Sequence, residues 1–501
     1  MLYARSSLAT TMSVVAMAVG LCACASVASI ISDRQVSAPA CADHSDPNAA
    51  GSLAAAIARM GGKAAQITLF GDGTYEIKSS MTVPRNITLR FENGAVLSVP
   101  AGISLTIDGG IDAGMQQIFS GEGTVTGKIK VPHTYPQWFG AVGDGTADDT
   151  LAVQRAIDLA CRSGVLCVNL ASGKYRITRT LDCTNTRALG TISRDGLRIF
   201  GSSFVGTALI GETGDGRAVI ETSGSQWLTL DEFMITTGRN NPSTVGLFTG
   251  VPKILPQSQN QTYHLYIGLG DEPADNDGLG SIAVWNFGAE EHTYDRMYIH
   301  ANRPVVLSAY NGSQGFTYKN SYVELLEVHS LGVTTFTGEC FLACLNKRFP
   351  AVTTVDINSL HMQNTYIGVT FGSEGKNTCA FDVRGVLDGF TYAGTIEGYA
   401  GFARVGGSIT GANVTATFGG LIDPTEAVLV MGDAGRIVNS DMKFQHNEQG
   451  KRPMFRQENP ESKANALLNT TIKSNQSPEW TTMSETMKSN SVNSEVLAAP
   501  R

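Results

Sequence analysis

The chain has 501 residues, of which 55 are glycine and 16% are charged, and its formal net charge is -8. This negative balance argues against a nucleic acid or an anionic membrane surface as partner, and an anionic polysaccharide would need a local basic site or a calcium bridge. Length alone indicates about three domains, but a solenoid reaches this length as one quasi-linear unit.

The first 30 residues form a targeting segment. Arg5 is its only basic residue, and the apolar stretch Ser13–Leu21 is too short for a comfortable transmembrane helix. Leu21-Cys22-Ala23-Cys24 resembles a bacterial lipobox, which would make Cys24 a lipidated residue. The alternative is ordinary signal cleavage after Ala23. We therefore predict a secreted protein, or a periplasmic or outer-membrane lipoprotein anchored through Cys24.

Residues 31–64 are predicted to be a linker that ends in one short helix, Leu53–Met60. The next segment, 65–131, contains an internal repeat at an offset of 16 residues, Thr82–Leu97 against Ser98–Ala113. Its alternating apolar positions indicate strands with one inward face, and its Pro and Gly residues mark corners. We interpret this segment as a small N-terminal β-solenoid module whose coil is 16 residues long.

A glycine-rich loop and an amphipathic helix come next, in the stretch YPQWFGAVGDGTADDTLAVQRAID (Tyr135–Asp158). Apolar residues recur at helical spacing from Leu151 to Ala160. Asp148 or Asp149 is positioned to cap the N-terminus of this helix. We expect the helix to cover the edge of a sheet, and Trp138 to be a core anchor at the junction.

This stretch closely resembles the opening signature of the pectate-lyase-like, right-handed parallel β-helix superfamily, which includes polygalacturonase- and rhamnogalacturonase-related enzymes and phage tailspike proteins. The resemblance implies an all-β fold: a right-handed parallel β-helix over 132–447 with an N-terminal capping helix. It does not imply one reaction, because a single solenoid hosts lyases, hydrolases, adhesins and inactive scaffolds.

Strand-like segments follow the helix, and the clearest of them share a polar pair followed by alternating apolar residues. Aligning these segments at offsets of 32, 32, 24 and 39 residues predicts which side chains lie in register. The segments are Asp231–Ile235, Tyr263–Ile267, Asp295–Ile299, Lys319–Val323 and Asn358–Met362.

This alignment places Asp231, Tyr263 and Asp295 in one exposed column and Glu232, His264 and Arg296 in the next. Asp231 and Asp295 would then be roughly 10 Å apart, near the upper end of the spacing of carboxylates in inverting glycosidases.

The resulting site hypothesis assigns catalysis to Asp231, Asp295 and Glu291, with one group as acid and one as base. Arg296 and His264 would bind substrate, and Arg296 suits a uronate carboxylate. The alternative is that these polar residues only solvate an outer face. A slip of one residue in register would also scramble the columns.

Tyr266 and Tyr298 are predicted to face outward on the same side of adjacent coils, and to bind substrate in a surface groove. Lyase chemistry would need a basic residue and calcium, for which the acidic loop 270–278 is the candidate. Otherwise we expect neither a cofactor nor a metal site. The chain contains no His-Gly, and its only Asp-Asp is Asp148-Asp149; polygalacturonase-type chemistry is therefore in doubt.

Cysteine pairs Cys161/Cys167 and Cys340/Cys344 could each be a disulfide or two buried thiols. The polar tail, 448–501, is predicted to be largely disordered. We therefore predict a secreted protein that engages a polysaccharide, with glycoside hydrolase favoured over lyase. The alternative is a non-catalytic carbohydrate-binding or structural solenoid derived from a phage tailspike, for which a homotrimer is expected.

Overall fold

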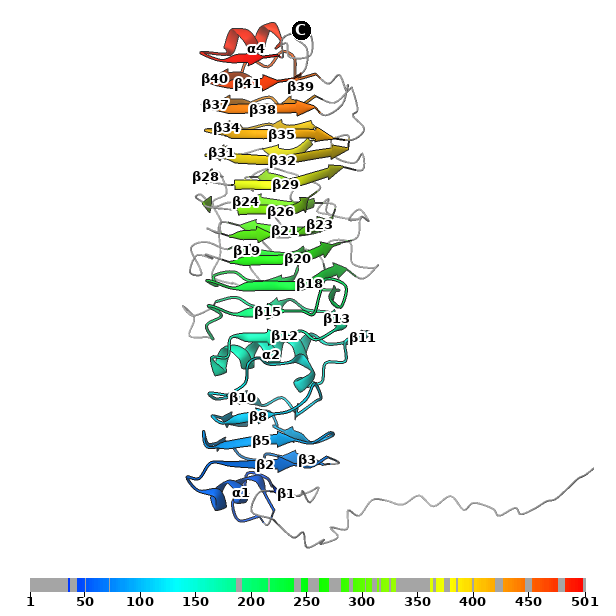
Figure 1. The fold of residues 1–501 in the computed structure, drawn as a ribbon, viewed down its shortest axis with the longest axis vertical. Helices are drawn as coiled ribbons and strands as arrows, with labels where there is room; N and C mark the ends of the chain where they lie inside the picture. The colour runs from blue at the N-terminus through cyan, green and yellow to red at the C-terminus, as the bar shows by residue number, and fades with distance from the viewer. Residues whose placement is uncertain are drawn as a thin grey trace, which may run out of the picture.

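The structure is a computed structural model that describes most of the chain beyond residue 42. The described residues are 35–36, 43–49, 51–71, 73–185, 192–214, 217–237, 245–250, 261–269, 281–287, 292–301, 303–308, 313–314, 317–323, 326–329, 361–363, 366–373, 379–383, 386–398, 401–419, 427–446, 453–475 and 483–498. They stack along one long axis, with α1 at one end and α4 at the other (Figure 1).

Three small parallel sheets form the N-terminal part of the stack. All of their strands except β1 follow α1 (Leu53–Met60) in the chain. This helix starts where the sequence predicts and is capped by the Ser52 hydroxyl, an acceptor for the Ala55 N–H at 3.0 Å. The sheets comprise β1 (Gln35–Val36), β2 (Ala65–Leu69), β5 (Ile87–Phe91) and β8 (Gly110–Asp112); β4 (Met81–Val83), β7 (Ser104–Ile107) and β10 (Thr124–Thr126); and β3 (Thr74–Glu76), β6 (Val96–Ser98) and β9 (Phe119–Ser120).

The predicted coil length of 16 residues is wrong. Leu89 of β5 lies opposite Ile67 of β2 and Ile111 of β8, so one coil spans 22 residues here. The repeat itself is present: its first copy covers β4 and β5, and its second copy covers β7 and β8. The matched strands β5 and β7 lie in different sheets, because β7 belongs to the sheet of β4. Each coil has three strands, and each strand is followed by a turn. The 16-residue offset leads from β5 to β7, two strands later, so it measures two sides of the coil and not the whole coil.

The glycine-rich loop and the helix behind it join the small sheets to the longer ones. η1 (Pro136–Phe139) buries Trp138, whose indole N–H donates to the Gly114 carbonyl at 3.0 Å, so the predicted core anchor is confirmed. β11 (Asp144–Asp148) then leads into α2 (Thr150–Ser163), whose apolar face packs on η1, β12, β10 and β14. Figure 1 shows α2 lying across the stack between β10 and β12.

Three long parallel sheets form the rest of the stack. The first comprises β11, β12 (Cys167–Asn169), β13 (Gly173–Ile177), β15 (Arg198–Phe200), β16 (Thr207–Gly211), β18 (Thr229–Thr237), β20 (Thr262–Gly268), β22 (Thr293–Asp295), β23 (Tyr298–His300), β26 (Thr317–Val323), β29 (Tyr366–Ser373), β32 (Thr391–Gly398), β35 (Asn413–Gly419), β38 (Asp441–His446), β41 (Thr471–Ser474) and β42 (Glu495–Leu497). We call it the long sheet.

The other two sheets close the triangle. One comprises β14 (Leu181–Asp182), β17 (Ala218–Glu221), β19 (Val245–Gly250), β21 (Ile282–Phe287), β24 (Arg303–Ser308), β27 (Leu326–His329), β30 (Cys379–Val383), β33 (Gly401–Val405), β36 (Leu429–Met431) and β39 (Phe455–Gln457). The other comprises β25 (Ser313–Gln314), β28 (His361–Gln363), β31 (Val386–Asp388), β34 (Ser408–Thr410), β37 (Arg436–Val438) and β40 (Ala466–Leu468).

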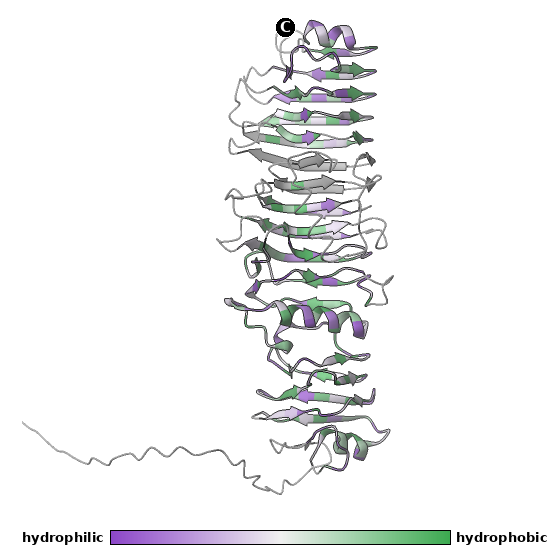
Figure 2. Cartoon of the chain, turned by 180° about the vertical axis from the view of Figure 1, so that it is seen from behind, coloured by the Kyte–Doolittle hydropathy of each residue, from purple (hydrophilic) through white to green (hydrophobic). Residues whose placement is uncertain are grey.

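The protein is thus a right-handed parallel β-helix, as the sequence predicts. Every strand pairing in the described residues is parallel, which in a solenoid lets each coil bury its apolar side chains against the next. Green and purple alternate along the strands in Figure 2, as expected of strands with one inward and one outward face. In the described residues, no helix is long and apolar enough to span a membrane.

One other expectation differs from the structure, and one open alternative is decided for Cys161 and Cys167. Met362 lies in β28, opposite Ser313 of the third sheet, so the last of the five aligned segments does not belong to the long sheet. Cys161, Cys167, Cys183 and Cys379 are free thiols, whereas Cys340 and Cys344 lie outside the described residues.

The C-terminal segment contains strands β39–β42 and the helix α4 (Glu485–Asn490), where its composition predicts disorder. Asn439, Asn469 and Asn493 occupy equivalent corners with φ between 48° and 50°. The Asn469 amide donates to Asn439 at 3.1 Å, and that of Asn493 donates to Asn469 at 3.3 Å. Asparagine tolerates the left-handed conformation, so a polar ladder orders a segment with few apolar residues.

Candidate functional site

The candidate site lies on the outer face of the long sheet, where β18, β20, β22 and β23 run side by side. On β20, Tyr263, Leu265 and Ile267 point inward and are fully buried. The residues between them, His264 and Tyr266, therefore belong to the outward face. Inward and outward side chains alternate along β20 without interruption. The register of the neighbouring strands is therefore described relative to β20.

A one-residue bulge at Glu232 shifts the register between the two halves of β18. Leu230 pairs with Tyr263 and Asp231 with His264, but after the bulge Phe233 pairs with Leu265. Glu232 has a φ of 58°, and Arg296, between β22 and β23, has a φ of 52°. Each is an extra residue in a left-handed conformation, as a bulge requires.

The predicted columns are therefore wrong in their first half. Tyr263 does not join Asp231 in an exposed column but is buried opposite Leu230 and Tyr294. The outward column instead contains Asp231 and His264, with Asp295 continuing it on the next strand because Tyr263 pairs with Tyr294. Glu232 and Arg296 project beside this column from their bulges.

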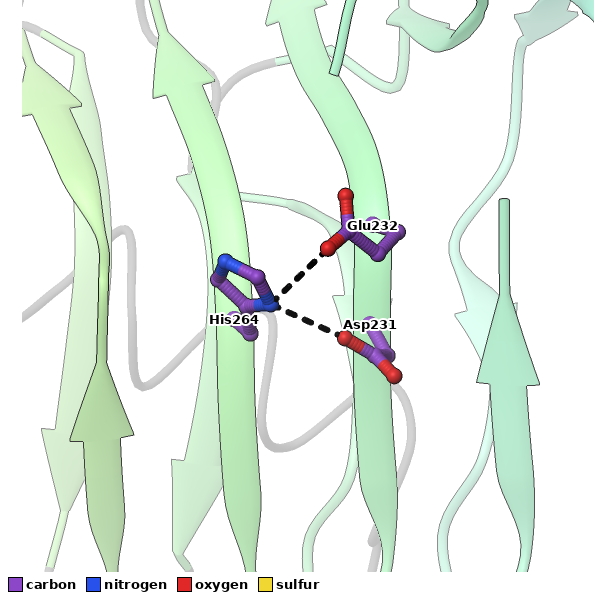
Figure 3. A group of neighbouring side chains, drawn as sticks. All are labelled: Asp231, Glu232 and His264. Atoms are coloured by element: carbon purple, nitrogen blue, oxygen red, sulfur yellow. Dashed lines mark hydrogen bonds and ion pairs between the residues drawn. The ribbon is translucent and has the colours of Figure 1, made fainter. Parts of the chain in front are cut away.

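His264 contacts two carboxylates at once. Its Nδ1 lies 3.0 Å from Asp231 Oδ1 and 3.5 Å from Glu232 Oε1, and Figure 3 shows both carboxylates converging on that nitrogen. The imidazole is only 6% exposed, although it sits on the outer face. The ring of Phe204 packs edge-on against it, with the centroids 4.9 Å apart. The group can thus hold a proton, or a cation, between an imidazole and two carboxylates.

Arg198 engages the other oxygen of Asp231. The Arg198 guanidinium donates to Asp231 Oδ2 at 2.7 Å and lies over the ring of Phe200. Arg198 is half-exposed and comes from β15, one coil before β18, where Phe200 is the register partner of Asp231. Asp231 is therefore held from both sides, by a guanidinium and by an imidazole.

Asp295 is the second predicted catalytic carboxylate, and it lies one coil beyond His264. Its partners include the neighbouring Arg296, at 3.9 Å, and its register partner on β26 is Lys319. The Arg296 side chain is 61% exposed, as a residue that recognises a bound anion needs to be. Asp231 and Asp295 are separated by two coil spacings, about 10 Å.

Tyr266 and Tyr298 stack on the outer face, as the sequence predicts. Their ring centroids are 4.7 Å apart and the planes differ by 7°. They continue a register column from Met234 of β18 to Tyr322 of β26. Gly268 has no side chain in the way of Tyr266: a Cβ there would lie 2.7 Å from the tyrosine ring.

Some predicted residues lie outside the described part of the chain. These are Glu291, the lipidation candidate Cys24 and the acidic loop 270–278. Their roles stay predictions.

Sequence reasoning missed Arg198 and Phe204 as members of the site. Arg198 lies on a strand that lacks the polar-pair motif, and Phe204 lies in a turn between β15 and β16. A basic residue one coil before an acidic pair could have indicated an ion pair. It can be recognised only once the register of the strands is known.

A second acidic pair, Asp148-Asp149, has a structural role. Asp149 accepts from the Val142 N–H at 2.7 Å and the Gly143 N–H at 3.1 Å, which ties the glycine-rich loop to the start of α2. Burial raises the pKa of Asp149, and these backbone donors offset part of the rise. Asp149 occupies the N-cap position without a side-chain capping bond, because its oxygens face the loop, whereas Asp148 Oδ1 accepts the N–H of Thr150, the first residue of α2, at 3.0 Å.

Comparisons with known proteins identify no family for this chain. No family model matches the sequence, and no curated protein matches it. Solved structures similar to this chain include tailspike protein 2 of the Escherichia coli O157:H7 bacteriophage CAB120, with 14% identity, a TM-score of 0.42 and coverage of 69% of this chain and 43% of the tailspike. The matched part thus spans less than half of the tailspike's own length.

Two further similar structures illustrate the range of proteins with this architecture. A surface adhesin of Streptococcus pneumoniae has 12% identity and a TM-score of 0.47, with coverage of 68% of this chain and 85% of the adhesin. The A-module of a mannuronan C-5 epimerase from Azotobacter vinelandii has 13% identity and a TM-score of 0.35, with coverage of 74% and 100%. What these proteins share with this chain is the right-handed parallel β-helix.

Proposed function

We propose that the outer face of β18–β23 binds a polysaccharide and that the chain cleaves it as a glycoside hydrolase. The observation that carries this proposal is the parallel stack of Tyr266 and Tyr298 directly beside the column of Asp231, His264 and Asp295. Aromatic rings pack against the apolar faces of sugar rings, and carboxylates are the groups that glycosidases use.

The surface along the column is suited to an extended ligand. A row of threonines, one per coil, flanks the polar column on the side away from the tyrosines: Thr229, Thr262 and Thr293. Successive coils repeat at about 4.8 Å, close to the length of one sugar residue, so a chain lying along the stack meets similar groups at each step. The exposed Arg296 would pair with a uronate carboxylate.

The two carboxylates would have different tasks. Asp295 is the candidate acid that protonates the glycosidic oxygen. In the ion-free chain, Asp231 is the candidate base that activates a water: Arg198 holds its Oδ2 at 2.7 Å, and its Oδ1, which His264 Nδ1 contacts at 3.0 Å, would accept the proton. Their separation of about 10 Å lies near the upper end of the range for inverting enzymes, so we expect inversion at the anomeric carbon.

A non-catalytic carbohydrate-binding solenoid is the second candidate, and one observation favours it. Each described carboxylate of the site has a basic neighbour from the chain itself: Asp231 has Arg198, Glu232 has His264, and Asp295 has Arg296. Carboxylates with such neighbours are suited to binding and orienting a ligand. Lyase chemistry with calcium is the third reading, and its acidic loop 270–278 lies outside the described residues.

The test is cleavage of a panel of neutral and uronic-acid polysaccharides by the purified full-length chain, with and without calcium. Release of reducing ends without unsaturated uronate is the expected result. Asp231→Asn and Asp295→Asn should each lower the rate at least about 100-fold, as expected for loss of an acid or base. Asp112→Asn, an exposed aspartate of the N-terminal sheets, is the matched control and should leave the rate unchanged.

The alternatives give distinct results. Unsaturated uronate would identify a lyase and contradict the roles given to the two aspartates. Glycan binding without any cleavage would identify the non-catalytic solenoid. Cleavage that survives both substitutions would place the active site elsewhere on the chain.

A further inference from the structure

The convergence of Asp231 and Glu232 on one imidazole nitrogen needs an explanation beyond a hydrogen bond. The donor atoms of Asp231, Glu232 and His264 all lie within 4.8 Å of one another. The N–H of one imidazole nitrogen points best at one acceptor, and Asp231 lies nearer to it, at 3.0 Å. The 3.5 Å contact with Glu232 is then no more than the weak arm of a three-centre hydrogen bond.

We propose that Asp231, Glu232 and His264 bind a divalent first-row transition ion, with Zn²⁺ as the representative. In a tetrahedral site whose metal–ligand bonds are about 2.0–2.2 Å long, two donor atoms are separated by roughly 3.3–3.6 Å. The distances from His264 Nδ1 to the two carboxylate oxygens, 3.0 and 3.5 Å, lie close to that edge length. A cation between these atoms would satisfy both carboxylates at once.

The chemistry of the ligands selects the kind of ion. One imidazole nitrogen with two carboxylate oxygens suits Zn²⁺ and its neighbours in the first transition row. Calcium takes six to eight oxygen ligands and magnesium an octahedron of oxygens, so both are poorly matched to a three-residue set that contains a nitrogen.

The bulge in β18 is what assembles the ligands. In a regular strand Asp231 and Glu232 would point to opposite faces of the sheet. The left-handed conformation of Glu232, with a φ of 58°, keeps both side chains on the outer face, where Figure 3 shows both reaching from β18 toward the imidazole. The two ligands thus come from adjacent residues of one strand, and the third comes from the next coil.

The surroundings of the three residues also resemble those of metal ligands. Arg198 holds the non-coordinating oxygen of Asp231 at 2.7 Å, the kind of outer partner that orients a ligating carboxylate. Phe204 packs on the imidazole and limits its rotation and its exposure to water. The positive charge of Arg198 opposes the cation, and we therefore expect moderate affinity, in the micromolar range.

Three protein ligands leave at least one coordination position for water or a substrate oxygen, as in catalytic zinc sites. Tyr266, two residues beyond His264 on the same face of β20, lies about 7 Å along the strand. An ion here would meet a hydroxyl of a sugar stacked on the tyrosine. Metal binding itself does not rest on the proposed glycan chemistry, and it is tested without any glycan.

The test is titration of the chelator-treated full-length chain with Zn²⁺ by isothermal calorimetry. Cobalt(II) loading would report the coordination through its visible absorption. One ion per chain is expected. His264→Gln and Glu232→Gln should each weaken binding by about 100-fold or more, beyond the effect typical of outer-shell partners. Calcium at tenfold excess should not compete.

Matched controls separate this site from other metal-binding groups of the chain. His133→Gln alters a histidine whose ring contacts the Tyr135 hydroxyl at 2.6 Å outside the site, and it should leave the affinity unchanged. Circular dichroism of each variant verifies the fold; Glu232→Gln has the least structural risk, because the Glu232 side chain is 42% exposed. Absence of stoichiometric binding would overturn the proposal, and so would binding that survives both substitutions.

Discussion

The loop before α2 and the outer face of β18–β23 each contain two consecutive acidic residues, and they use them in opposite ways. In the loop, Asp149 is 1% exposed and its oxygens accept backbone N–H groups. On the outer face, the side chains of Asp231 and Glu232 are 20% and 42% exposed and face only other side chains. The first pair fixes the path of the chain, whereas the second pair faces solvent and whatever binds there.

The hydrogen-bond partners of an acidic residue thus distinguish a structural role from a binding role. Its position in a sequence motif does so less well. Backbone donors cannot be replaced by a ligand without rebuilding the loop. Side-chain partners such as Arg198 and His264 can rearrange around a bound ion or sugar at little cost to the fold. Three experiments test this difference, from the largest expected effect to the smallest.

Asp149→Ala should destabilise the protein most. The substitution leaves the Val142 and Gly143 N–H groups without their acceptor, and hydrogen bonds to a charged group are worth about 1.5–3 kcal/mol. We expect a loss of about 2 kcal/mol or more in the free energy of unfolding, measured by denaturant titration followed by circular dichroism. Asp231→Ala is the matched control and should cost less than about 1 kcal/mol, because its ion pair with Arg198 is partly exposed. Equal losses in the two variants would contradict the distinction between the two regions.

Tyr266→Ala should weaken glycan binding and leave stability nearly unchanged. The stack with Tyr298 has a partly exposed outer surface, and an aromatic contact of this kind is worth about 0.5–1.5 kcal/mol. The expected result is a loss of about 3- to 10-fold in affinity for the polysaccharide identified in the panel, measured by affinity electrophoresis. Tyr266→Phe keeps the ring and should bind like the parent chain. Unchanged binding by Tyr266→Ala would remove the tyrosine pair from the site.

The two loop aspartates should change the acid stability in opposite directions. Burial by itself would raise the pKa of Asp148, but hydrogen bonds from Thr150 and Thr178 hold it below the ordinary value of 3.8. Asp148 therefore contributes stability above that value, which is lost as the pH falls through its folded pKa. For Asp149, whose pKa is raised chiefly by burial, the contribution is present below 3.8 and is lost as the pH rises through its folded pKa.

Melting temperatures of Asp148→Asn and Asp149→Asn from pH 6 to about pH 3 would measure this effect. The deficit of Asp148→Asn relative to the parent should shrink as the pH falls, and that of Asp149→Asn should grow. Parallel curves for the two variants would show that their environments do not differ as the structure indicates.

The fold was predictable because its signals are local. The stretch Tyr135–Asp158 indicated the parallel β-helix through its resemblance to a family signature, and the short helix Leu53–Met60 was predicted from the residues themselves. The outward stacking of Tyr266 and Tyr298 was also predictable, since the alternation on β20 and β23 is regular over those residues.

The rest of the site was not predictable, because it depends on register. Glu232 and Arg296 are extra residues in left-handed conformations, and neither is a glycine or an asparagine that would signal such a turn. A sequence alignment that counts these two residues as regular strand positions wrongly places Tyr263 on the outer face. It also wrongly places His264 outside the column of Asp231. The 16-residue repeat failed for a related reason, as sequence periodicity does not distinguish a whole coil from two of its sides.

The bulge at Glu232 also bears on how such a surface can change over time. It absorbs one additional residue within a single coil, while Ile235 and Ile267 beyond it remain opposite each other. An insertion or deletion at this position therefore rewrites the outward chemistry of one coil and leaves the core and the neighbouring coils intact. The outward residues of one coil can therefore change independently of the other coils. A group of residues such as Asp231, Glu232 and His264 can be gained or lost in evolution while the fold is kept.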